Sequence, residues 1–224
     1  MRKRGGRERR SAPRGGSAVE FVLLSVFWVP LLTGVLVIGT AMIRAIEAVQ
    51  VARDAGHMYA RGVDFALEGN QRLLARLGED MGLKVTGGEG VVILSKISYI
   101  GPFQCKAEQL ADNSDPPNPT GECKNYQHYV FVQRVVVGDS GLRSSRFGAP
   151  DPSLLQAGGR VSSSDRVRKE GARVSNFDLL PAPPVDGSGG FQAGQYAYLV
   201  EAAFKAPKLP GLPGDGTVYV HAIF

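Results

Sequence analysis

An uncharged apolar run constrains this chain more than any other feature. Residues 21–43 read FVLLSVFWVPLLTGVLVIGTAMI, which is 23 residues without a charge between Glu20 and Arg44. As an α-helix the run is roughly 34 Å long, enough to cross the ~30 Å hydrocarbon core of a bilayer. A secretory signal peptide has a shorter apolar core, about 7 to 15 residues, followed by a small-residue cleavage site. Because the chain after the run continues a helical pattern without such a site, we predict a membrane helix that stays attached.

The positive charge of the chain is concentrated before this run. The first fifteen residues hold seven of the 26 basic side chains and one of the 21 acidic ones, so the rest of the chain has 19 bases, 20 acids and a net charge of −1. The net charge of +5 and the pI near 9.3 therefore describe a short basic segment, and no nucleic-acid footprint remains. The excess of Lys and Arg predicts a cytoplasmic N-terminus and an exported C-terminal domain.

The junction between the basic segment and the apolar run reads R-G-G-S-A-V-E-F. A carboxylate such as Glu20 at the start of a membrane helix is favoured by the exposed N–H groups and by the positive end of the helix dipole. At low dielectric, a pair between this carboxylate and an amine would set the axial register of neighbouring helices. Taken alone, Glu20 is equally compatible with the interfacial cap of a signal anchor.

These residues together resemble the start of a TadE-like minor pilin, or pseudopilin, of the tight-adherence (type IV-like) pilus. In that family a prepilin peptidase cuts after a glycine that ends a basic leader, and the fifth mature residue is a glutamate followed by an aromatic. A cut between Gly15 and Gly16 makes Glu20 the fifth mature residue and Phe21 the sixth. The resemblance covers about residues 14–62 and implies processing at this bond.

The resemblance also implies a role and a set of partners. The chain is expected to span the bacterial inner membrane once and to join the pilus or its assembly complex, where it acts in pilus assembly, adhesion or secretion. Its implied partners are the membrane, the prepilin peptidase, other pilins and the assembly platform proteins. Pro30 removes one backbone hydrogen bond inside the membrane helix and is expected to loosen or kink it. An uncleaved signal-anchored binding or scaffold protein and a membrane-anchored envelope enzyme remain alternatives.

The exported part predicts an α+β fold, with a long N-terminal helix packed on a small antiparallel sheet in a pilin-like way. Small or apolar residues recur every three or four positions from Ile46 to about Leu67, so the helix should continue for about six turns until Gly69 and Asn70 weaken it. Residues 71–81 should extend the helix or pack back, and a stalk that only spaces the domain from the bilayer is the alternative. Runs rich in β-branched and aromatic residues predict four strands, at 90–100, 126–138, 195–205 and 217–224.

These expectations divide the chain into four parts: a leader at 1–15, a membrane helix at 16–43, a helical extension at 44–82 and a β-rich domain at 83–224. Within the last part, residues 139–194 are dense in Gly, Ser and Pro and predict a long loop with one short helix or edge strand and no more. The mixed charges of residues 165–170 predict a solvated stretch of this loop.

The two cysteines, Cys105 and Cys123, lie between the first two predicted strands. In an exported domain they favour a disulfide, which would stabilise the fold by about 3 kcal/mol. The histidines, at positions 57, 128 and 221, lack metal-ligand spacing, and the chain has no nucleophile-elbow, P-loop or dinucleotide motif. The sequence therefore predicts no catalytic residue, metal, cofactor, nucleic acid or small-molecule substrate.

Overall fold

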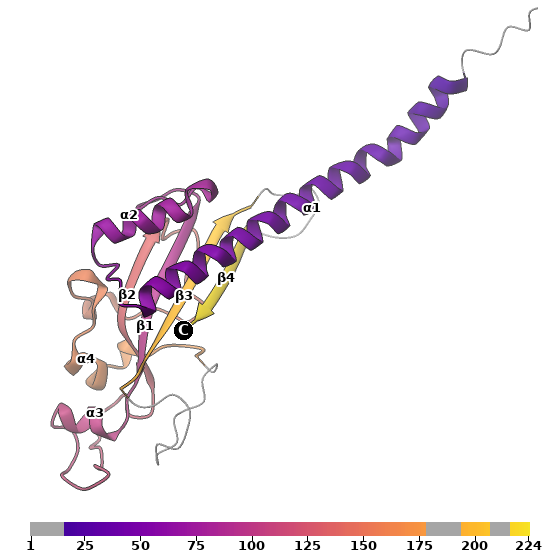
Figure 1. Cartoon of the computed structure of the whole chain (residues 1–224). Helices are drawn as coiled ribbons and strands as arrows, with labels where there is room; N and C mark the ends of the chain where they lie inside the picture. Colours follow the sequence, from indigo (N-terminus) through magenta and orange to yellow (C-terminus); the bar gives the residue numbers. More distant parts are fainter. Residues whose placement is uncertain (1–15, 178–193, 207–215) are drawn as a thin grey trace, which may run out of the picture. The chain divides into compact units, whose positions relative to one another are not determined.

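The computed structural model describes residues 16–177, 194–206 and 216–224 (Figure 1). The chain divides into two units, Met1–Met42 and Ile43–Phe224. Helix α1 (Gly16–Ala60) begins in the first unit and ends in the second.

The first unit consists of the apolar part of α1, as far as it is described. Among the described residues, α1 is the one helix that is long and apolar enough to cross a membrane, and no part of its most apolar window is buried. Pro30 lies inside α1, and the helix continues on both sides of it. The chain thus has an N-terminal apolar helix compatible with a single-pass membrane anchor.

The second unit is built on one antiparallel sheet with the strand order β2-β1-β3-β4. The register of β1 and β2 shifts by one residue between Lys96 and Ile97. The four predicted strands are confirmed as β1 (Gly90–Tyr99), β2 (Tyr129–Gly138), β3 (Tyr196–Lys205) and β4 (Thr217–Ile223). The described part of this unit also contains the short helices α3 (Pro102–Ala107) and α4 (Ser163–Arg168) and the 3₁₀ turns η1 (Glu79–Met81), η2 (Pro152–Leu154), η3 (Ala157–Gly159) and η4 (Glu170–Ala172).

Two helices cover one face of the sheet. The buried residues of α1 recur every three or four positions, so they form a stripe along one side of the helix. This stripe packs against alternate residues of the strands, and α2 (Glu68–Leu77) contributes Leu74 to the same apolar core. The stripe consists of Ala48, Val51, Ala52, Ala55 and Tyr59. The predicted α+β fold, a long N-terminal helix packed on a four-stranded antiparallel sheet, is therefore confirmed.

Helix α1 ends earlier than the apolar pattern predicts. Gly62 has a φ of 91°, a left-handed conformation that favours glycine. Its N–H donates to the carbonyl of Tyr59, and the Val63 N–H donates to the carbonyl of Met58, which together form a Schellman cap. The predicted continuation to about Leu67 is wrong, because this cap stops the helix and the chain turns into the separate helix α2.

The predicted apolar stripe is confirmed at Ala52, Gly56 and Tyr59, which are buried, and is wrong at Ile46 and Val49. Ile46 is 59% exposed and Val49 is 38% exposed, whereas the smaller Ala48 and Ala55 are buried. Small side chains allow the helix backbone to lie close to the sheet, and this close approach outweighs the preference for burying larger apolar residues. At Gly56 the approach is closest, because an added Cβ would lie 1.9 Å from the ring of Phe224.

The segment after β2 covers the opposite face of the sheet rather than forming an open loop. A second apolar cluster is formed there by residues of β1, β2 and β3 and of this segment. Phe147 and Phe177 are buried in this second apolar cluster. The segment also lies along β2, where the Val161 N–H donates to the carbonyl of Val132 over 3.0 Å. The short helix expected within this segment is α4, and residues 178–193 lie outside the described part of the chain.

The charged stretch at residues 165–170 was predicted to be a solvated loop, and this prediction is wrong. Its first four residues belong to α4, which begins with Ser162 accepting a hydrogen bond from the Asp165 N–H over 3.1 Å. Val167 is buried and belongs to the second apolar cluster. This apolar contact and the hydrogen bonds from Asn125 Nδ2 to the carbonyls of Arg166 and Lys169 hold the helix on the domain.

The predicted disulfide is present in the structure. Cys105 in α3 and Cys123 in the following loop are bonded, with a Cα–Cα distance of 5.8 Å, and both side chains are buried. The bond cross-links the connection between β1 and β2, which contains no other regular element besides α3 among the assigned helices and strands. It therefore cross-links a loop-rich segment whose own hydrogen bonds form turns, such as the bond from the Thr120 N–H to the carbonyl of Leu110.

Replacing both cysteines with alanine should lower the free energy of unfolding by about 3 kcal/mol, because the unfolded chain regains the freedom that the cross-link removes. Urea unfolding of the full-length protein in detergent, followed by the near-ultraviolet circular dichroism of its tyrosines, measures this change. Lys124→Ala is the matched control, since Lys124 is an exposed neighbour of Cys123 and its loss should change stability by less than about 0.5 kcal/mol. An unchanged urea midpoint in the double variant would contradict the prediction.

Candidate functional site

The predicted assembly residues lie at the start of α1. Gly15 lies outside the described residues, and Gly16 is the first residue of the helix. Glu20 follows Gly16 by four positions, so the two residues share one side of the helix. Phe21 is 72% exposed and Pro30 is also exposed. This part of α1 therefore presents a carboxylate and apolar side chains without partners from the described chain.

The hydroxyl groups within the apolar part of α1 are satisfied by the helix itself. Ser25 donates to the carbonyl of Val22 over 2.8 Å, and Thr33 donates to that of Val29 over 2.8 Å. A polar side chain that bonds to its own helix costs little in lipid, where an unpaired one is expensive. Glu20 is the acidic side chain at the edge of this apolar surface, which makes it the group best placed for a specific polar contact with another helix.

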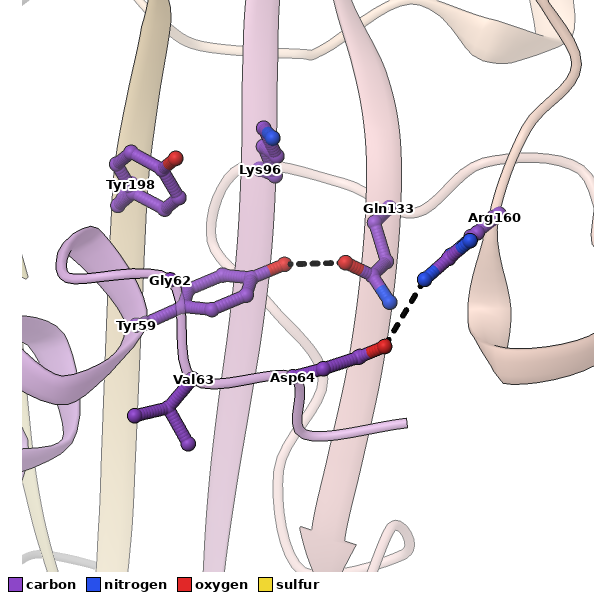
Figure 2. A pocket seen from close by; sticks show the side chains of 8 residues that line it. All are labelled: Tyr59, Gly62, Val63, Asp64, Lys96, Gln133, Arg160 and Tyr198. Atoms are coloured by element: carbon purple, nitrogen blue, oxygen red, sulfur yellow. Dashed lines mark hydrogen bonds and ion pairs between the residues drawn. The ribbon is translucent and has the colours of Figure 1, made fainter. Parts of the chain in front are cut away.

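A second candidate site lies on the domain, beyond the end of α1 (Figure 2). A cavity of about 230 Å³ is lined by Tyr59, Lys96, Gln133, Arg160 and Tyr198, among others. A second cavity of about 350 Å³ shares Lys96, Gln133 and Arg160 and adds Arg166. A third, of about 230 Å³, is lined by Arg166, Tyr196 and Glu108, among others. We call this connected hollow the basic–aromatic basin and define it by Lys96, Gln133, Arg160, Arg166, Tyr196 and Tyr198.

The basin exists because the sheet is longer than the helix that covers it. Alternate residues of a strand face the same side, so Val92, Leu94 and Lys96 of β1 all point toward the α1 face. Val92 and Leu94 lie in the core beneath the helices, whereas Lys96 lies beyond the cap at Gly62. The side chains on this face thus change from apolar to polar where the helix cover ends.

A network of polar contacts fixes one wall of the basin. The Tyr59 hydroxyl donates to Gln133 Oε1 over 3.1 Å, and Gln133 Nε2 donates to the carbonyl of Gly158 over 2.9 Å. Arg160 Nη2 lies 2.9 Å from Asp64 Oδ2 in an ion pair, which Figure 2 shows as a dashed line. Burial raises the pKa of Tyr59 above its usual range, so this hydroxyl keeps its proton and remains a donor. Gln133 and Arg160 are therefore held in place before any ligand binds.

Asp64, the acidic residue of this wall, is paired with a base of the same wall, Arg160. The backbone N–H of Ala66 donates to Asp64 and is the main cause that lowers the pKa of this carboxyl group, with Gln133 and Arg160 acting in the same direction. Asp64 is thus ionised at neutral pH and balanced by Arg160. The other charged residues that line the three cavities are Lys96, Arg166 and Glu108.

Lys96 stands against two aromatic rings. Its Nζ lies 3.7 Å from the ring centroid of Tyr196 and 5.5 Å from that of Tyr198. A cation over an aromatic face is stabilised by the ring quadrupole and keeps its N–H donors available. Among the described residues, no carboxylate forms an ion pair with Lys96 or Arg166. The basin therefore presents positive charge beside aromatic surface.

A buried carboxylate on the opposite face of the sheet is bonded entirely to groups of the protein itself. Glu201 of β3 is 1% exposed and accepts hydrogen bonds from the Ser145 hydroxyl, from the Arg146 N–H over 2.9 Å and from the Tyr219 hydroxyl over 2.6 Å. Burial raises the pKa of Tyr219, and the bond to Glu201 raises it further. Arg143 lies 4.2 Å from the Tyr219 ring centroid. This cluster ties the segment after β2 to the sheet, which is a structural role.

Sequence reasoning missed both the basin and the buried carboxylate. The signal for the basin was the change from Val and Leu to Lys and Ser along β1, and the signal for Glu201 was one acid within an apolar strand. The three histidines do not converge, and the described residues contain no group of three or more His, Cys, Asp or Glu side chains that could hold a metal ion. Comparison with known proteins found no matching family model, no matching curated protein and no matching solved structure.

Proposed function

We propose that this protein is a TadE-like minor pilin that a prepilin peptidase processes between Gly15 and Gly16. It would lie in the bacterial inner membrane with its N-terminus in the cytoplasm and its sheet domain exported, and it would join a tight-adherence pilus. There it would act in assembly, adhesion or secretion with other pilins and the platform proteins. The observation that carries this proposal is the R-G-G-S-A-V-E-F junction at the head of one long helix.

The architecture of the described chain supports the proposal. The first part of α1 is apolar and unburied, and its last turns form the backing of a four-stranded sheet. One helix can thus serve both as a membrane anchor before assembly and as a packing element afterwards. Association of such helices in lipid depends on close packing and on a few polar contacts, because lipid removes the hydrophobic driving force between them.

N-terminal sequencing of the membrane-extracted protein tests this function. In a host with an active prepilin peptidase, we expect the mature sequence to begin GSAVEF, since cleavage at the proposed bond exposes Gly16. Gly15→Val should block the cut, because a β-branched side chain replaces the glycine at the scissile bond. Gly6→Val is the matched control, as it makes the same change within the basic segment and away from the bond.

The result that would overturn the proposal is equally clear. Retention of residues 1–15 by the unmodified protein, in a host that processes its own pilins, would favour an uncleaved signal-anchored binding or scaffold protein. Cleavage in Gly15→Val at an unchanged rate would place the processing site elsewhere and remove the role assigned to Glu20 as the fifth mature residue.

A further inference from the structure

We propose that the basic–aromatic basin binds a carboxylate-bearing sugar, as one residue of an acidic oligosaccharide. This binding role goes beyond the proposed pilus function and does not depend on it, because the basin lies wholly within the unit Ile43–Phe224. It would hold equally for an uncleaved envelope protein.

The size and position of the basin fit a small ligand. Its cavities of about 230, 350 and 230 Å³ adjoin through shared residues, with Lys96, Gln133 and Arg160 common to the first two and Arg166 common to the last two. Small-molecule sites commonly occupy about 300 to 1,000 Å³. The walls are preformed, since Gln133 and Arg160 already have protein partners at 2.9 Å. A ligand would therefore find fixed groups rather than having to order them.

The basin has a net positive charge, because its lining holds three bases, Lys96, Arg160 and Arg166, against two acids, Asp64 and Glu108. Arg160 is offset by Asp64 in a 2.9 Å ion pair, whereas Lys96 and Arg166 form no ion pair within the described residues. Lys96 is half-buried between two tyrosines, where it is less exposed to solvent than a free surface lysine. A ligand carboxylate at this place would form charge-assisted hydrogen bonds, which are stronger than those between neutral groups.

The aromatic rings favour a sugar over a simple anion. Tyr196 is 44% exposed, and Lys96 Nζ lies over one face of its ring, which leaves the other face of the ring for the C–H face of a sugar. The hydroxyl groups of a sugar would bond to the guanidinium groups of Arg160 and Arg166. Phosphate sites typically use backbone N–H groups at a helix N-terminus or in a glycine-rich turn, whereas this basin presents side chains. A long nucleic acid is disfavoured, because the chain after residue 15 has 19 bases against 20 acids.

Calorimetric titration of the full-length protein with trigalacturonate tests the proposal, in a detergent whose headgroup is not a sugar. We expect binding that weakens with added salt, because the Debye length shortens and screens the attraction. The fully methyl-esterified trisaccharide should bind at least about tenfold more weakly, since it keeps the rings and loses the charges. Inorganic phosphate at equal concentration should fail to displace trigalacturonate.

Variants assign the binding to the basin. Lys96→Gln and Arg166→Gln should each weaken binding by about tenfold, as expected for loss of a charge-assisted hydrogen bond. Tyr196→Ala should weaken it by a similar factor of about ten, and Tyr196→Phe should retain it because the ring remains. Lys84→Gln is the matched control, because Lys84 is an exposed lysine before β1, at the opposite end of that strand from Lys96. Thermal unfolding of each variant should match that of the unmodified protein.

Three results would overturn the proposal. Equal affinity for trigalacturonate and its methyl ester would mean that the ligand carboxylates do not contribute to binding. Displacement by phosphate would indicate a general anion site, such as one for a lipid headgroup, instead of a sugar site. Unchanged affinity in both Arg166→Gln and Tyr196→Ala, with normal thermal unfolding, would place any binding outside the basin. Lack of cleavage at the N-terminus would not change any of these three binding measurements. Failure of the pilus proposal can therefore be distinguished from failure of the sugar-binding proposal.

Discussion

Glu20→Ala should abolish incorporation of the protein into a pilus and leave its insertion into the membrane intact. Insertion depends on the apolar run and on the basic residues before it, and the substitution changes neither. Incorporation on our proposal depends on a pair between the Glu20 carboxylate and the free amine of Gly16, on the same or a neighbouring subunit. In a low-dielectric surrounding such a pair fixes the axial register, and an unpaired amine is costly.

The measurement is the amount of protein in sheared pili compared with the amount in the membrane fraction. We expect a normal membrane level and loss of at least about nine-tenths from pili, since one unpaired buried charge costs about 3–5 kcal/mol per contact. Glu20→Gln should fail as well, because it keeps the shape and loses the charge. Ser25→Ala is the matched control in the same helix, because the Ser25 hydroxyl already donates to the carbonyl of Val22 in its own helix. Normal pili with Glu20→Ala would exclude this pairing mechanism.

Glu201→Ala should lower the free energy of unfolding by about 3–5 kcal/mol, which is a large part of the stability of a domain of this size. The carboxylate is buried and accepts hydrogen bonds from Ser145, Arg146 and Tyr219. Its removal leaves these donors without their acceptor, and each buried unpaired donor costs about 1–3 kcal/mol. The segment that begins after β2 would then lose its tie to β3 and β4.

Urea unfolding of the full-length protein gives this change, and hydrogen exchange shows where it acts. We expect the largest increase in exchange for the amide groups at residues 143–148 in Glu201→Ala, and for β1, which lies between β2 and β3, an increase no larger than the global loss of stability gives. Glu89→Gln is the matched control, because Glu89 is an exposed carboxyl group just before β1 and should change stability by less than about 0.5 kcal/mol. A similarly small effect of Glu201→Ala would mean that the carboxylate does not hold this segment.

Much of the fold could be predicted because its signals are local. Strand positions followed from runs of β-branched and aromatic residues, and the cysteine pair followed from two cysteines within one connection. The end of α1 was not predicted, because the apolar spacing continues past Ala60 and the left-handed conformation of Gly62 competes with it. The buried side of α1 was predicted only in part, at Ala52 and Tyr59, since burial there depends on how closely alanines can approach a sheet built from residues far along the chain.

The sequence by itself determined the long apolar N-terminal helix, the four strands and the disulfide, because hydropathy, periodicity and cysteine content are properties of short stretches of the chain. Only the tertiary structure decided where the helix cover of the sheet ends and which residues meet beyond it. Lys96, Gln133 and Arg160 are separated by tens of residues, and their meeting depends on strand register and on the cap at Gly62. The same holds for Glu201 and its hydrogen-bond donors, because the packing of segments far apart in the sequence decides which polar groups are buried together.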